Sequence, residues 1–221
     1  MDKVKVQLNV STKWFILFFV LTTFVACSNK KKVEVKNNDG VVIESYFVDK
    51  KNPDTKIGIY NKYYDDGKIL EVSNFKDGKM NGERTLYYPS GKIMQVENYV
   101  DNKFEGKFIA YNEDGSLQQE GLYKDNMMNG IWKNYFKDQK NKVKEEITLK
   151  DNHVNGLYKE YYPNGNIFAS GNKKEIMDDL DVFEGEVQIF DSLVNNKLIR
   201  KLHFENGRQT SKEEITNWGK E

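Results

Sequence analysis

A 24-residue period runs through most of this chain. Evenly spaced glycines mark the period, and an aromatic residue follows each of them five positions later. The strict copies are Gly58, Gly82, Gly106 and Gly130, followed by Tyr63, Tyr87, Tyr111 and Tyr135. With small insertions the pattern continues to Gly156 and Gly185, followed by Tyr161 and Phe190. Such a period is typical of a tandem array, whose units bury apolar surface by stacking on their neighbours.

Each repeat contains two turn signals. Nine residues after four of the anchor glycines, a second glycine follows Asp, Asn or Ser, and an aliphatic residue comes two positions later. These turn glycines are Gly67, Gly91, Gly115 and Gly165. A second turn closes the unit with Asp-Gly or Asp-Asn, at residues 77–78, 101–102, 125–126 and 151–152. These pairs predict β-hairpins, because Gly and Asn accept the positive φ of tight turns.

The repeat therefore predicts an all-β fold, an elongated single-sheet antiparallel meander of hairpins. Six hairpins with strands about 4.8 Å apart would make a rod about 50 Å long. Two sites break the pattern: residues 139–143 lack the turn glycine, and residues 173–182 insert a segment that we interpret as an acidic loop. Ser211–Trp218 is the one stretch of the mature body with a helix-like pattern.

The N-terminus has the features of an export signal. Three lysines precede an apolar run at residues 14–26, which is shorter than the roughly 20 residues of a transmembrane helix. Cys27, the only cysteine, follows at once in the context Phe-Val-Ala-Cys, which resembles a bacterial lipobox. The resemblance implies cleavage before Cys27 and acylation of its thiol. An ordinary signal peptide or an uncleaved anchor is the alternative.

These features divide the chain into five segments. We expect a lipoprotein signal peptide at 1–26, an acylated Cys and flexible tether at 27–40, and a capping strand and loop at 41–55. The repeat array occupies 56–208, and a C-terminal tail occupies 209–221. Membrane attachment through lipid places the protein in the cell envelope, and Ser28 favours the outer membrane.

Charge argues against a nucleic-acid partner. Without residues 1–26 the chain has 31 basic and 33 acidic residues, a formal charge of −2, and the two signs are interleaved. Nucleic-acid binders usually carry a basic face. We interpret the cluster Lys30, Lys31 and Lys32 as a solvated tether, with contact to anionic headgroups as the alternative.

Strand alternation gives each hairpin two apolar faces. One face carries Ile59 and Tyr63 and their equivalents. The other carries an aromatic stripe, Tyr60, Phe108, Trp132 and Tyr158. We favour a cross-strand ladder that stabilises the sheet and binds nothing. Because one sheet layer cannot bury both faces, a binding stripe centred on Trp132 is the alternative.

Catalysis is not predicted. His153 falls in a turn and His203 in a strand, and neither has a nucleophile nearby in the sequence. No metal-ligand spacing or cofactor motif is evident. An envelope-polymer hydrolase would need paired carboxylates, but candidates such as Glu97 and Glu120 fit solvent-facing strand positions.

The combination of anchor glycine, aromatic, turn glycine and closing Asn-Gly resembles the MORN repeat, specifically its bacterial variant, over about residues 56–208. The resemblance implies an elongated antiparallel sheet. Some members of that family carry an antitoxin label, and MORN arrays are linked to lipids, scaffolding and self-association. We therefore expect a non-enzymatic envelope lipoprotein that presents its array to a protein or glycan. An antitoxin-like or immunity-like inhibitor is the alternative, and self-association through open sheet edges is compatible with both.

Overall fold

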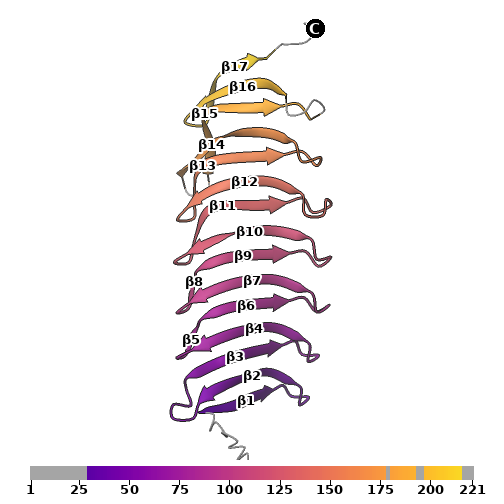
Figure 1. Cartoon of the computed structure of the whole chain (residues 1–221), viewed down its shortest axis with the longest axis vertical. Helices are drawn as coiled ribbons and strands as arrows, with labels where there is room; N and C mark the ends of the chain where they lie inside the picture. The colour runs from indigo at the N-terminus through magenta and orange to yellow at the C-terminus, as the bar shows by residue number, and fades with distance from the viewer. Residues whose placement is uncertain (1–28, 178–179, 193–196, 216–221) are drawn as a thin grey trace, which may run out of the picture.

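The fold is a single open sheet. The computed structural model describes residues 29–177, 180–192 and 197–215, and within them it contains one 17-stranded antiparallel sheet and no helix. Each long strand pairs with the long strands before and after it along the chain, so the topology is a meander, drawn in Figure 1 as a tall stack of bowed strands. The predicted all-β single-sheet meander is confirmed.

The strands follow chain order along the stack. Their bounds are β1 (Lys30–Lys36), β2 (Val42–Asp49), β3 (Lys56–Tyr63), β4 (Ile69–Lys76), β5 (Lys79–Met80), β6 (Gly82–Tyr87), β7 (Ile93–Val100), β8 (Lys103–Phe104), β9 (Gly106–Tyr111), β10 (Leu117–Lys124), β11 (Met127–Tyr135), β12 (Val143–Lys150), β13 (His153–Tyr161), β14 (Ile167–Met177), β15 (Leu180–Phe190), β16 (Leu198–Glu205) and β17 (Arg208–Glu214).

The turns have the geometry that the sequence predicts. The four turn glycines adopt φ between 82° and 91°. In the second turns both residues have positive φ, for example Asp125 at 50° and Asn126 at 69°. In the irregular repeat, Asn141 at φ 57° takes the place of the missing turn glycine. Asn visits this left-handed region more readily than other side-chain-bearing residues, so the hairpin survives the substitution.

Side chains connect each repeat to the next one. The Oδ1 atom of Asn126 accepts a 2.8 Å hydrogen bond from the backbone N–H of Phe104, and the Asn126 N–H donates to the Phe104 carbonyl at 3.1 Å. Asn102 and Asn152 make the same pair of bonds. On the opposite edge, Tyr64 donates to the carbonyl of Tyr87, 23 residues away, at 2.7 Å. These bonds fix the register between neighbouring repeats.

The predicted flexible tether at 27–40 is wrong for most of its length. Residues 30–36 form β1, which pairs with β2 from Lys30↔Asp49 to Lys36↔Val42. Asn37 supports the β1–β2 turn, because its side chain accepts hydrogen bonds from the N–H groups of Asp39 and Val41. The expected capping strand at 41–55 is present as β2, and it lies inside the sheet with β1 at the end.

The C-terminal boundary also needs correction. The predicted tail begins as a strand, because β17 pairs with β16 after a turn in which Asn206 and Gly207 both have positive φ. Residues 211–214 therefore do not form a helix. The expected acidic loop at 173–182 is largely strand, since β14 and β15 continue their pairing to Met177↔Leu180.

The sheet is longer than the six expected hairpins. The two-residue strands β5 and β8 share rungs with β6 and β9, so the described residues form fifteen rungs. At about 4.8 Å per rung this gives a rod of about 70 Å rather than 50 Å. The predicted signal peptide and Cys27 lie outside the described residues.

Candidate functional site

The four residues of the predicted binding stripe lie in the core. Tyr60, Phe108, Trp132 and Tyr158 are all buried, and Trp132 is only 1% exposed. We call the face that carries them the inner face. The alternative in which this face is displayed to solvent is wrong, because its large rings stack on one another along the axis of the rod and cover themselves. Their packing is that of the cross-strand ladder.

Trp132 is the centre of this packing. Its ring lies 5.4 Å from that of Phe108 and 5.1 Å from that of Tyr123, and its Nε1–H donates to the Leu122 carbonyl at 3.2 Å. The indole occupies the space above Gly121, where a Cβ atom would meet the ring at 2.2 Å. A glycine inside a predicted strand often marks such a close approach, and this signal was present in the sequence.

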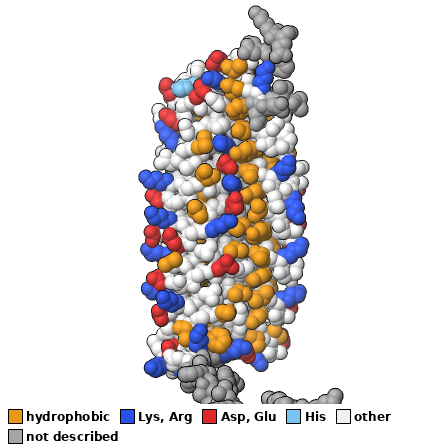
Figure 2. All heavy atoms as spheres, in the orientation of Figure 1, with side chains coloured by type: hydrophobic (Ala, Val, Ile, Leu, Met, Phe, Trp, Pro, Cys, Tyr) orange, Lys and Arg blue, Asp and Glu red, His pale blue; other side chains and the backbone are white. Residues whose placement is uncertain are grey.

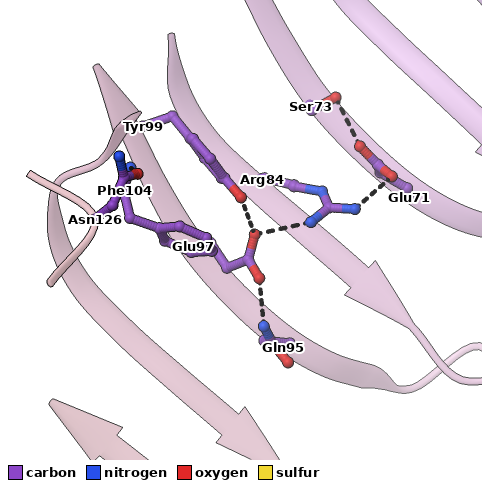
Figure 3. A network of polar contacts seen from close by, with 8 residues as sticks. All are labelled: Glu71, Ser73, Arg84, Gln95, Glu97, Tyr99, Phe104 and Asn126. Atoms are coloured by element: carbon purple, nitrogen blue, oxygen red, sulfur yellow. Dashed lines mark hydrogen bonds and ion pairs between the residues drawn. The ribbon is translucent and has the colours of Figure 1, made fainter. Parts of the chain in front are cut away.

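A buried polar network interrupts the apolar inner face between β4 and β7 (Figure 3). Arg84 donates to Glu71 at 2.9 Å and to Glu97 at 3.0 Å. Glu97 also accepts hydrogen bonds from Tyr99, at 2.9 Å, and from Gln95. Glu97 is 2% exposed, so its predicted solvent-facing position is wrong. An unpaired buried carboxylate destabilises the folded state, and the guanidinium shared by Glu71 and Glu97 offsets this destabilisation.

The electrostatics of this network follow from its contacts. The hydrogen bond that Arg84 donates to Glu71 raises the pKa of Arg84, and the one that it donates to Glu97 adds to the effect, so the guanidinium stays charged. Burial, with the hydrogen bond to Glu97, raises the pKa of Tyr99 to about 12. Every Glu97 oxygen already has a partner, since Oε2 accepts from Arg84 and Tyr99 and Oε1 from Gln95. The network therefore has the character of a structural ion pair.

The opposite face is the uncovered one. It carries Ile59, Ile131 and Leu157, which are 50%, 52% and 42% exposed, and we call it the outer face. A displayed aromatic stripe would have required these residues on the packed side, and the structure has them on the uncovered side. Strand alternation gives the same pattern for either choice, whereas ring size decides the outcome: the face with the larger aromatic groups at the strand centres becomes the core.

An aromatic–aliphatic row follows the outer face near the first turns. In each hairpin the aromatic residue that ends one strand pairs with the aliphatic residue that opens the next. The pairs are Tyr63↔Ile69, Tyr87↔Ile93, Tyr111↔Leu117, Tyr135↔Val143, Tyr161↔Ile167 and Phe190↔Leu198. Ile93 is exposed and the others are half-buried. One such pair per hairpin produces a hydrophobic column along the axis, and Figure 2 shows such a column with charged groups on both sides.

Charges of alternating sign run beside this row. Glu120 faces Lys133, Lys133 faces Glu146, and Glu146 faces Lys159 across successive strand pairs from β10 to β13. The Lys133 Nζ atom lies 3.6 Å from Glu120 and 3.9 Å from Glu146. The Tyr135 hydroxyl donates to Glu120 at 2.9 Å. This series of four side chains, which we call the charge ladder, is therefore tied to the aromatic–aliphatic row.

The tyrosines beside the charge ladder stay neutral at ordinary pH. Burial, with the nearby Glu146 carboxylate, raises the pKa of Tyr161 to about 12. Burial and the hydrogen bond to Glu120 likewise raise the pKa of Tyr135. A neutral phenol beside a carboxylate acts as a hydrogen-bond donor, which orders the carboxylates on this face.

A shallow hollow opens on the outer face at the centre of the array. Its lining comes from β9, β10 and β11 and combines apolar with charged side chains. The lining residues are Lys107, Glu120, Gly121, Leu122, Ile131 and Lys133. Leu122 and Ile131 are each about half exposed. The hollow is a contact surface of mixed character.

The two histidines lie apart from these features. The His153 Nδ1 atom lies 3.0 Å from a Glu175 carboxylate oxygen on the surface. His203 lies opposite Glu186 and Ser211 on neighbouring strands. Within the described ranges, no group of three His, Cys, Asp or Glu side chains could hold a metal ion. Over the same residues, no helix is long and apolar enough to cross a bilayer.

The fold and its repeated contacts define the class of protein, a β-meander repeat protein with one packed and one uncovered face. The MORN repeat variant model matches this chain at residues 56–77, 80–101, 104–125 and 154–174. The chain therefore contains four tandem repeats of the MORN variant, as its sequence resemblance implied. Repeats of this family are generally non-catalytic. Among curated proteins, no sequence matches this chain.

Several solved structures have local similarity to the sheet. The structure of TarM is 16% identical over 45% of this chain and 22% of its own, with a TM-score of 0.23. The Photorhabdus luminescens Tc holotoxin pore is 11% identical over 84% of this chain and 13% of its own, with a TM-score of 0.21. The chain thus spans less than a quarter of each of these proteins.

Proposed function

We propose that this protein is a non-enzymatic envelope lipoprotein that is anchored through Cys27 and binds a protein partner on its outer face. One observation supports the binding face. In the described residues no second layer covers the outer face, so Ile59, Ile131 and Leu157 remain about half exposed there. Contiguous apolar surface on a stable sheet is typical of interaction sites.

The composition of the face supports a protein partner. The aromatic–aliphatic row supplies apolar contact area, and the charge ladder beside it offers alternating donors and acceptors. Such a combination suits another protein surface, whose polar rim and apolar centre it complements. The bonds between repeats hold the face rigid, which reduces the entropy that is lost on binding.

Crosslinking in intact cells tests the binding face. We expect one dominant crosslinked protein, which is lost when Ile131→Ser and Leu157→Ser are combined. The control, Val35→Ser, removes an exposed aliphatic side chain from the inner-face side of β1 and should keep the crosslink. Equal crosslinking by all three chains would contradict the proposal. Binding to purified cell-wall glycan, without a crosslinked protein, would identify a glycan as the partner and contradict a protein partner.

Lipid attachment has a separate test. Labelling of growing cells with palmitate should mark the wild-type protein, and Cys27→Ser should abolish the label. A protein that is labelled equally in both forms would contradict acylation at Cys27.

A further inference from the structure

The first strand forms a basic end of the sheet. β1 pairs with β2 along one edge, and all its residues are exposed except half-buried Val33. Four of its seven residues are lysines, against one glutamate. The lysines are Lys30, Lys31, Lys32 and Lys36. Because side chains alternate along a strand, these lysines border the end of the rod on both faces.

A second element adds charge at the same end. The turn between β2 and β3 carries exposed Lys50 and Lys51 against one exposed acid, Asp54, and the Lys50 N–H donates to the Asn29 carbonyl at 2.9 Å. At the other end of the sheet, the charged residues of β17 are two basic and two acidic. The rod is therefore electrostatically polar, although the whole chain has a net charge of zero.

The first strand begins close in the sequence to the expected lipid anchor. Asn29 is held by its side chain, which donates to both carboxylate oxygens of Asp49 at 3.1 and 3.0 Å. Only Ser28 separates it from Cys27, so the α-carbons of Cys27 and Asn29 are at most about 7 Å apart. This distance is within the screening length of about 8 Å at physiological salt. This step rests on the proposed acylation of Cys27.

We propose that the exposed lysines of β1 and of the β2–β3 turn make this end of the rod a positively charged surface that binds an anionic phospholipid membrane. The rod, about 70 Å long, projects from the membrane, with β17 at its far end. A lysine-rich edge disfavours strand addition by another sheet, so a lipid surface suits this end better than a protein strand does. The one ion pair inside β1, Lys32 with Glu34 at 2.6 Å, is exposed and readily exchanged for lipid phosphate.

Vesicle sedimentation tests this surface without the lipid anchor. The chain from residue 27 with Cys27→Ser retains all seventeen strands, because β1 begins at Lys30. It should bind phosphatidylglycerol-containing vesicles at low salt and dissociate from them at high salt. It should not bind vesicles of pure phosphatidylcholine. Replacing Lys30, Lys31 and Lys32 with Gln should weaken binding by roughly a hundredfold, about fivefold for each lysine.

A matched variant separates local from total charge. Lys137, Lys140 and Lys142 are exposed in the irregular turn between β11 and β12, and replacing them with Gln removes the same charge far from β1. This variant should bind like the parent chain. Equal weakening by both triple variants, or no binding to phosphatidylglycerol by the parent, would overturn the proposal. Either result would leave palmitate labelling and outer-face crosslinking intact, so the two proposals fail separately.

Discussion

At the residue scale, the core depends on a few places where a small residue makes room for a large one. Gly121 lies beneath the Trp132 indole, and Gly171 lies beneath Val187, where an added Cβ would meet a side-chain carbon at 2.8 Å. Neither glycine has the positive φ of the turn glycines. They are therefore required for space and not for backbone conformation.

We predict that Gly121→Ala lowers the free energy of unfolding by about 1–3 kcal/mol, because overpacking forces the indole or the strand to shift. Urea denaturation followed by Trp fluorescence measures the change. Gln118→Ala, at an exposed position of the same strand, should have little effect. Adding Trp132→Leu to Gly121→Ala should cost less than the sum of the two single changes. Strict additivity would show that the two residues are not coupled.

The sequence predicted which residues are apolar at each position of the repeat, but not which face they cover. Tyr60 and Tyr63 are both tyrosines three positions apart, and alternation alone treats their faces as equal. The choice depends on how rings in successive strands stack, which involves residues in different repeats, such as Phe108, Tyr123 and Trp132. Arg84 was not identified from the sequence, because Glu71 and Glu97 are distant from it along the chain.

At the element scale, the turns determine the register. Local pairs such as Asp125-Asn126 were recognisable because their backbone conformation depends on two residues alone. β1 and β17 were missed for the opposite reason. Their sequences are polar, and only their pairing with β2 and β16 makes them strands.

We predict that Asn126→Gly destabilises the protein by about 1 kcal/mol, because it removes the hydrogen bond to Phe104 N–H and keeps a residue that tolerates positive φ. Thermal and urea unfolding measure the effect. Asn206→Gly is the control, since this residue also has positive φ but its side chain accepts only a long 3.4 Å bond from exposed Lys174. An equal decrease in the free energy of unfolding in both variants would mean that the flexibility of glycine, and not the lost hydrogen bond, causes the destabilisation.

At the scale of the whole molecule, stability is distributed along the rod. Tyrosines with raised pKa values lie in different repeats. They include buried Tyr60 and half-buried Tyr99 and Tyr161, whose pKa values are each about 12. Burial is the main cause in each case, and nearby carboxylates add to it. The folded state therefore favours neutral phenols throughout its length.

We predict that the free energy of unfolding is insensitive to tyrosine ionisation below pH 10 and falls as the pH rises from 10 towards 12. In this range the unfolded chain loses phenolic protons that the folded chain retains, so rising pH favours unfolding. Urea titrations at successive pH values measure the slope, and Tyr99→Phe should make it shallower. A stability that is constant across this range would contradict the assignment.

The bond from Asn126 to Phe104 reaches backwards along the chain, as do those of Asn102 and Asn152. Each of these units therefore docks on one that has already left the ribosome, and it does not wait for a more C-terminal segment. Folding can advance at the pace of emergence, with a single growing front. A chain built in this way gains or loses a unit by gene duplication or deletion without redesign of the remainder.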